Sequence, residues 1–351
     1  MESAYVRSVP LFPNPLEAAA FRLSIVPPMF ADYFGVLGFH ALVAGVRLGV
    51  FDALQTRPMP AAQLAVELGA DRRHTETLLR SLLGLGYLKR RADRYHLTRA
   101  ARTWLCADSP LCLAEGLAFW ERCATRIWPG LEKSVRDGTP AVPFYTLTEG
   151  DPELSRSFQA WTAAIARRQG PATAAAIPVH RDARQVLDVG GSHAVYSLEL
   201  LRRHPELRAT VIDLPQALTA APPHPRLTLR AGSFLDDDLG EGFDLVLLFN
   251  IIHGLGDAEL AVLLRRVARA LNPGGLLVIG DQFKGAMPGR ASRTLLDLLD
   301  LNYLIAGGAG IRTFAEVGRL LTAAGFGRPR HRRPLGAPSG ELALARTPLP
   351  A

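Results

Sequence analysis

The chain has 351 residues, of which 48% are apolar, and a formal net charge of +7 at pH 7. A chain of this length buries a large core and is more often two domains than one. It has neither an uninterrupted apolar run of membrane-spanning length nor an amino-terminal secretion signal, which predicts a soluble, cytoplasmic protein with no membrane partner.

The amino-terminal part of the chain has the pattern of a winged helix-turn-helix. Residues 34–54 are apolar around most of a helix, so a second subunit or another domain should cover them. Two helices follow, over residues 59–70 and from Asp71 onward, and residues 87–98 form two short strands around a polar turn. This order of elements predicts a winged-helix domain over residues 1–106.

The winged helix is compatible with dimerisation and with DNA binding. Its second helix begins with Arg72, Arg73 and His74, which favours DNA. The rest of that helix offers few of the Asn, Gln and Arg side chains that read base edges, and the apolar helix before it favours protein contact. The pattern therefore favours a homodimer formed through this domain and no nucleic-acid partner, with a DNA-binding regulator as the alternative.

Residues 107–351 are predicted to form a second domain, an α/β fold with a doubly wound, Rossmann-like, mainly parallel sheet. Residues 107–176 form a helical connecting layer that faces the open end of the sheet. Amphipathic segments such as 257–271 separate apolar strand candidates from about residue 183 onward. These candidates are residues 185–190, 207–213, 227–234, 243–253 and 276–283.

Three further features of the chain carry predictions. Residues 272–275 predict a tight turn after a helix, and the basic run at 328–334 predicts a solvated loop. The three cysteines, Cys106, Cys112 and Cys123, lack the paired spacing of zinc ligands. They predict buried, small apolar side chains and no metal site.

The turn after the first strand of the sheet is the most informative local motif. Residues 186–197 read VLDVGGSHAVYS, which fits the frame Asp-x-Gly-x-Gly-x-Gly of S-adenosylmethionine-binding proteins, filled here by Asp188, Gly190, Ser192 and Ala194. A side chain at such a glycine position costs about 1 to 2 kcal/mol where φ must be positive. The turn therefore predicts either a nucleoside-ligand site or a plain strand-to-helix turn.

Asp213 favours the nucleoside site. It ends the next strand candidate, and a carboxylate at that place accepts both hydroxyls of a ribose in dinucleotide-binding folds. The alternative is an acidic cap on the following turn.

Together these motifs resemble the S-adenosylmethionine-dependent O-methyltransferases of secondary metabolism, which include plant caffeic-acid-type enzymes and bacterial enzymes that methylate aromatic natural products. The resemblance covers nearly the whole chain in a fixed order. It rests on the winged helix, the turn after VLDVGG, IDLP at 212–215, FNIIHGLGDAE at 249–259, LNPGG at 271–275 and GIRTFAEVGRLLTAAGF at 310–326.

The resemblance implies S-adenosylmethionine as cofactor. Asp213 would hold the ribose, Gly190 and Gly191 would lie beneath the methionine part, and Gly232, Ser233 and Phe234 would lie along the adenosine. Ser233 stands where the family usually has an acidic residue. The predicted cofactor-binding set is completed by Asp188, Leu214 and Asn250.

The resemblance also implies that His253 is the general base, emerging at the end of the strand 243–253. A neutral imidazole takes the proton of a phenol hydroxyl as the oxygen attacks the methyl group, and a carboxylate that orients the ring improves the base. Asp281 matches one of the family's acids, whereas Gly254 and Ile311 stand where it often has two others. The alternative for His253 is a cap on the adjoining turn.

These residues predict methyl transfer to a hydroxyl of an aromatic or polyketide-like small molecule. The substitutions at Ser192, Ala194, Gly254 and Ile311 leave open a relative that performs C-methylation, ring closure or hydroxylation instead. The connecting layer and the segment after Asp281 supply the predicted substrate-pocket residues, which are Phe158, Trp161, Asp297, Asp300, Asn302 and Tyr303.

Overall fold

The computed structural model describes residues 23, 25, 27, 29–285, 289–337 and 340–349. The chain divides into two compact units, and the boundary lies between Glu121 and Arg122. The sequence pattern placed the boundary after residue 106. The intervening segment stays with the first unit because Leu117 packs against that unit's core and Glu121 forms an ion pair with Arg47, 2.5 Å between Nη2 and Oε2.

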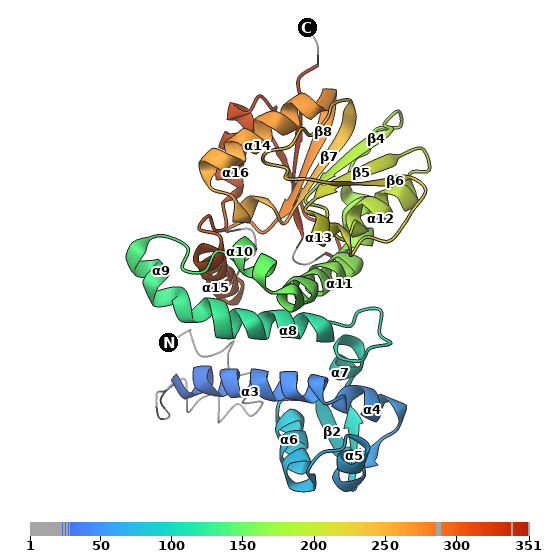
Figure 1. The fold of residues 1–351 in the computed structure, drawn as a ribbon, viewed down its shortest axis with the longest axis vertical. Helices are drawn as coiled ribbons and strands as arrows, with labels where there is room; N and C mark the ends of the chain where they lie inside the picture. Colours follow the sequence, from blue (N-terminus) through green and yellow to red (C-terminus); the bar gives the residue numbers. More distant parts are fainter. Residues whose placement is uncertain are drawn as a thin grey trace. The chain divides into compact units, whose positions relative to one another are not determined.

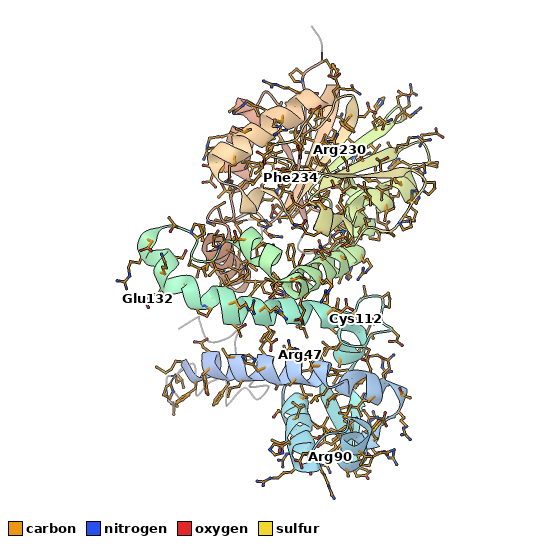
Figure 2. All side chains as sticks on the ribbon, in the orientation of Figure 1. Arg47, Arg90, Cys112, Glu132, Arg230 and Phe234 are labelled. Carbon is orange, nitrogen blue, oxygen red and sulfur yellow. The ribbon has the colours of Figure 1, made fainter. Side chains whose placement is uncertain are left out.

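The first unit has the order of a winged helix. It contains α3 (Met29–Arg47), α4 (Val50–Thr56), β1 (Met59–Pro60), α5 (Ala61–Glu67), α6 (Arg72–Gly84), β2 (Leu88–Arg91), β3 (Arg94–Leu97) and α7 (Arg99–Trp104), and its three strands form a sheet in the order β1-β3-β2. Asp71 caps α6 by accepting a hydrogen bond from the backbone N of His74, at 2.9 Å. Arg90 on β2 lies at the end of this unit remote from α3 (Figure 2).

The apolar segment at 34–54 is not one helix. Gly49, with φ of 78°, separates α3 from α4, because this left-handed conformation ends the helical hydrogen bonding. Apolar side chains of α3 face outward within this unit, and they include Met29, Phe30, Tyr33, Phe34, Val36 and Leu37.

One helix of the described residues, α3, could cross a membrane by its length and mean hydropathy, although the sequence has no uninterrupted apolar run there. By length and composition alone this helix meets the requirement, and only 17% of its most apolar window is buried. Asp32 and His40 interrupt its apolar residues.

A helical layer leads into the second unit. It comprises α8 (Ala114–Arg122), a π-helical turn (Cys123–Ile127), a 3-10 turn (Trp128–Gly130), α9 (Leu131–Asp137), α10 (Phe144–Gly150) and α11 (Pro152–Ala176). Asp151 caps α11 by accepting from the backbone N of Leu154 at 3.0 Å, and it also accepts from Arg122 and Arg126, each at 2.8 Å.

A seven-stranded sheet forms the centre of the second unit (Figure 1). The order is β6-β5-β4-β7-β8-β10-β9, with bounds β4 (Gln185–Val189), β5 (Arg208–Asp213), β6 (Leu227–Ala231), β7 (Phe243–Phe249), β8 (Leu271–Asp281), β9 (Arg330–Arg332) and β10 (Glu341–Arg346). The neighbouring strands β6, β5, β4, β7 and β8 pair in parallel, as predicted. Strand β10 runs antiparallel to β8 and β9.

Two local predictions fail in the sheet. The expected turn at 272–275 lies within β8, where the register against β7 shifts between Phe243 and Leu245, and Gly274 with φ of 74° takes up the irregularity. The expected loop at 328–334 contains β9, because pairing with β10 satisfies its backbone groups while its side chains stay exposed.

Helices cover both faces of this sheet, and the side chains of β7 alternate between two cores. Val246 and Leu248 belong to the core under α14 (Asp257–Ala270) and α16 (Phe314–Ala323). Leu245 and Leu247 belong to the core under α11 and α12 (Val195–Arg203). Two more helices, α13 (Pro215–Leu218) and α15 (Arg290–Ala306), follow β5 and β8.

Candidate functional site

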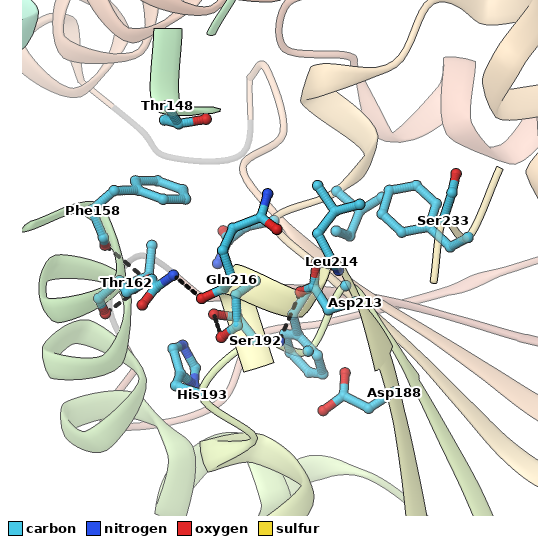
Figure 3. Close-up of a pocket in the computed structure, with 18 of the residues that line it drawn as sticks. Thr148, Phe158, Thr162, Asp188, Ser192, His193, Asp213, Leu214, Gln216 and Ser233 are labelled. Atoms are coloured by element: carbon cyan, nitrogen blue, oxygen red, sulfur yellow. Dashed lines mark hydrogen bonds between the residues drawn. The ribbon is translucent and has the colours of Figure 1, made fainter. Parts of the chain in front are cut away.

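A cavity of about 290 Å³ lies at the carboxyl ends of β4, β5 and β7 (Figure 3). This is the place where ligands bind in open α/β sheets. Its lining includes every residue of the predicted cofactor-binding set, namely Asp188, Gly190, Gly191, Asp213, Leu214, Gly232, Ser233, Phe234 and Asn250. Sequence reasoning missed other lining residues, among them Phe144, Gln159, Thr162, His193, Tyr196 and Gln216.

The turn after β4 has the left-handed backbone conformation at three positions where the motif has glycine, including the two that carry serine and alanine here. Gly190, Ser192 and Ala194 all have positive φ, of 68°, 39° and 57°. A Cβ on Gly190 would collide with Ile251, and one on Gly191 would lie 2.5 Å from Cγ of Asp188. The methyl group of Ala194 is fully buried in a small apolar cluster, which offsets part of the strain at that position.

Asp213 lies on the cavity wall, and its carboxylate can accept further hydrogen bonds. Its Oδ2 accepts from the backbone N of Ser192 at 2.9 Å, and its Oδ1 accepts from the backbone N of Leu214 at 2.7 Å. Burial raises the pKa of this carboxyl. Each carboxylate oxygen has two acceptor sites, so both oxygens remain able to accept a hydroxyl.

Asp188 is 1% exposed and has one oxygen without a partner. Ser197 Oγ donates to its Oδ2 at 2.7 Å, whereas Oδ1 has no hydrogen-bond partner among the described residues. Burial raises the pKa of Asp188 to about 7, with a further contribution from the charge of Asp213 and an opposing one from Ser197. A buried, unpaired carboxylate oxygen at a cavity wall fits a cationic ligand group.

The segment after β6 contributes the ring of Phe234 to the cavity wall, whereas the hydroxyl of Ser233 is hydrogen-bonded within the segment. Ser233 Oγ donates to Asp236 Oδ2, and its backbone N donates to Asp237 Oδ2, both at 2.7 Å. These bonds hold Ser233 within its own loop. Phe234 next to it lines the cavity.

His253 does not end a strand as predicted. β7 stops at Phe249, because Asn250 has φ of 55° and leaves the extended conformation, and His253 lies in the 3-10 turn Ile252–Gly254. Its Nδ1 is 2.8 Å from Oδ1 of Asp281, the last residue of β8. The side chains of His253 and Asp281 are 15% and 0% exposed, so the pair is well shielded.

Two other residues hold His253 in place. The ring of Tyr303 stacks on the imidazole with centroids 3.9 Å apart and planes 18° apart. Arg312 donates to the backbone oxygens of Ile252 and Leu255, the latter at 2.6 Å, on either side of the 3-10 turn. Sequence reasoning missed Arg312, whose only signal was its place in GIRTF.

The predicted substrate-pocket residues separate into different environments. Phe158 lines the cavity and meets Phe144 edge to face at 4.9 Å. The other predicted substrate residues do not line this cavity. The predicted catalytic pair, His253 and Asp281, does not line it either. Asn302 accepts from Trp128 Nε1 at 3.0 Å, and Tyr303 donates to Gln282 at 3.1 Å.

The remaining substrate candidates lie on α11 and α15. Asp300 is 2.5 Å from Lys284 Nζ and accepts from the backbone N of Ile311 at 2.6 Å. Asp297 is exposed on α15, and Trp161 is partly buried on α11. The helical pattern of the sequence did not indicate the direction in which the side chains of α15 would point.

Comparisons with known proteins agree with this architecture. Residues 128–327 match the family described as the O-methyltransferase domain, and residues 33–107 match the O-methyltransferase dimerisation domain. Acetylserotonin O-methyltransferase of Mus musculus is 30% identical over 327 residues, covering 86% of this chain and 84% of that protein. The tetracenomycin polyketide synthesis 8-O-methyl transferase TcmO of Streptomyces glaucescens is 29% identical, covering 82% of this chain and 88% of its own.

Solved structures show the same fold. Human N-acetylserotonin methyltransferase in complex with S-adenosylmethionine superposes with a TM-score of 0.81 at 24% identity, covering 92% of this chain and 97% of that one. The mitomycin 7-O-methyltransferase MmcR superposes with a TM-score of 0.79 at 23% identity, covering 94% and 100%.

Proposed function

The chain belongs to the S-adenosylmethionine-dependent O-methyltransferase family, and from that premise we propose that it methylates a hydroxyl of an aromatic or polyketide-like small molecule in secondary metabolism, with His253 as the general base. The observation that carries the proposal is the pairing of His253 with Asp281 at the carboxyl end of β8, in the same unit as the cavity lined by the cofactor set. The naphthoate and polyketide methyltransferases of Streptomyces among the relatives support the substrate class.

The residues around the cavity fit the cofactor. Asp213 would accept the ribose hydroxyls, Phe234 would contact the adenine, and Gly190 and Gly191 would let the methionine part approach the backbone. The unpartnered Oδ1 of Asp188 would face the ammonium group. When bound, S-adenosylmethionine supplies a methyl group on a positively charged sulfur and is released as S-adenosylhomocysteine.

The protein's own chemistry is a proton transfer. Asp281 accepts from Nδ1–H of His253, which leaves the lone pair of Nε2 free to take the proton of the acceptor hydroxyl as its oxygen forms the new bond to carbon. The proton then stays on Nε2 until it passes to solvent. Tyr303 and Arg312 fix the ring, so that the base is already oriented before the acceptor binds.

The function is tested by supplying S-adenosylmethionine and a panel of phenolic naphthoates and anthraquinones. We expect S-adenosylhomocysteine to form together with a product heavier by one methylene group. A converted acceptor without that gain in mass would contradict methyl transfer. Failure of S-adenosylhomocysteine to bind at millimolar concentration would contradict the use of this cofactor.

We further propose that a second copy of the chain covers the exposed apolar face of α3, which lies within the matched dimerisation domain. Phe34 and Leu37 are 41% and 46% exposed there. The double variant Phe34→Glu and Leu37→Glu is expected to sediment as a monomer where the unaltered protein sediments as a dimer. Val66→Glu, at an 83% exposed position of α5, is the matched control and should leave the dimer intact.

The raised pKa of Asp188 predicts that cofactor binding depends on pH. Without ligand this carboxyl is half protonated near pH 7, and an ammonium group beside Oδ1 favours the ionised form. Binding therefore releases a proton below pH 7, and affinity for S-adenosylhomocysteine should fall by up to about tenfold per pH unit as the pH decreases further. Calorimetry in buffers of different ionisation enthalpy measures the released proton.

The control for this prediction is a ligand without the ammonium group. 5′-Methylthioadenosine should bind with little pH dependence over the same range, and Asp188→Asn should abolish the proton release. Equal pH dependence for both ligands would contradict the assignment of the titrating group to Asp188.

A further inference from the structure

The cavity contains two carboxylates but no cation to meet an anionic ligand group. Asp188 and Asp213 line it, and none of the described residues that line it is arginine or lysine. The cofactor of the proposed function, on which this inference rests, carries an α-carboxylate as well as an ammonium group. A neutral donor must therefore meet that carboxylate.

His193 is a buried donor in the turn that would hold the methionine part. It is 8% exposed, lines the cavity and lies between Ser192 and Ala194, whose left-handed conformations fix its position. Figure 3 shows it on the same side of the cavity as Thr162 of α11.

The hydrogen bonding of His193 determines which ring nitrogen carries the proton. Its Nδ1 accepts from the backbone N of Val195 at 3.2 Å, so the neutral ring bears its hydrogen on Nε2. Burial, followed by the charge of Arg167, lowers the pKa of His193 to about 4. The ring is therefore neutral at physiological pH, and its Nε2–H has no acceptor among the described residues.

Three other side-chain donors on the turn and on α11 already donate to backbone oxygens of the protein. Thr162 Oγ1 donates to the backbone O of Phe158 at 3.1 Å, and Gln159 Nε2 donates to the backbone O of Gln216 at 2.9 Å. Ser192 Oγ donates to the backbone O of Ala217 at 3.3 Å. These bonds leave His193 as the uncommitted side-chain donor within the turn itself.

We propose that His193 Nε2–H binds the α-carboxylate of the cofactor, while Asp188 Oδ1 faces its ammonium group on the other side of Gly190 and Gly191. The site then recognises the zwitterionic amino-acid end with one buried carboxylate and one neutral imidazole. A neutral donor avoids placing a buried cation close to the positively charged sulfur, where it would weaken cofactor binding.

The test compares S-adenosylhomocysteine with its decarboxylated analogue, which keeps the amine, by calorimetry. His193→Leu should weaken binding of S-adenosylhomocysteine by about tenfold to a hundredfold and leave binding of the analogue unchanged. His193→Gln, which keeps an N–H donor, should recover part of the loss. His224→Leu is the matched control, because His224 likewise accepts from the backbone N two residues further on but is not among the residues that line the cavity, and this variant should retain affinity for both ligands.

The outcomes separate this inference from the proposed function. Equal weakening of both ligands by His193→Leu means that the ring only supports the turn, and overturns the inference. Unchanged affinity for S-adenosylhomocysteine in His193→Leu overturns it as well. A loss of affinity in His224→Leu that equals the loss in His193→Leu also overturns it. If the unaltered protein binds neither ligand, the proposed function fails and the inference fails with it.

Discussion

His253→Gln is expected to lower kcat for methyl transfer by about a hundredfold to ten-thousandfold, while the affinity for S-adenosylhomocysteine stays the same. The amide cannot accept the hydroxyl proton, but it can still donate to Asp281, which has a fully buried side chain. Alanine is the poorer choice, because it would leave that buried carboxylate with only the backbone N of Gln282 as a donor and destabilise the fold. Steady-state kinetics and calorimetry on the same preparation measure both quantities.

Asp281→Asn is the companion variant. The amide can donate to Nδ1 of His253 and so favours the tautomer with its hydrogen on Nε2, which removes the base without removing the ring. We expect a loss of kcat close to that of His253→Gln, and little further loss when the two changes are combined, because the two residues act as one unit. Full activity in His253→Gln would mean that His253 serves as a cap on its turn.

Arg312→Met is expected to lower the free energy of unfolding by about 2 to 5 kcal/mol. The Arg312 side chain is 8% exposed, and its loss leaves the backbone oxygens of Ile252 and Leu255 without their donor. Because these oxygens flank His253, we also expect kcat to fall by about a hundredfold, the effect of a displacement of about 1 Å in a reacting group. Chemical denaturation and kinetics test the two parts separately.

Asp257→Asn is the matched control for Arg312. Asp257 accepts from the same guanidinium at 2.8 Å, but its side chain is 79% exposed, so this ion pair should contribute less than about 1 kcal/mol. A loss in Asp257→Asn as large as that in Arg312→Met would show that the exposed ion pair, and not the two backbone contacts, holds the turn of His253.

Much of the cavity lining was predictable because its signals are local. The strands from β4 to β8 are apolar and bounded by turns, and each predicted cofactor residue follows or ends one of them. Parallel strands bring their carboxyl ends to one edge, so residues such as Asp188 and Asp213 had to meet there. The left-handed conformations of Ser192 and Ala194 were likewise indicated by the spacing of the frame.

The remaining features depend on contacts that no local pattern encodes. β9 has a basic, exposed sequence and becomes a strand only because β10 pairs with it. The position of His253 depends on the left-handed conformation of Asn250, which ends β7. Arg312, which holds the turn of His253, is 60 positions away from its acceptor Ile252 in the sequence. The directions of the substrate candidates on α15 depend on how this helix is rotated about its axis. That rotation is set by packing against other elements and not by its own sequence.

The antiparallel pairing of β10 with β8 orders events during synthesis of the protein. Glu341 stands opposite Asp281 and Arg346 opposite Leu276, so the strand that ends in Asp281 pairs only with β7 until these late residues leave the ribosome. The winged-helix unit contains all of its own strands before residue 98 and is free to fold much earlier. A growing chain therefore completes the part that matches the dimerisation domain long before it completes the strand pairing around Asp281.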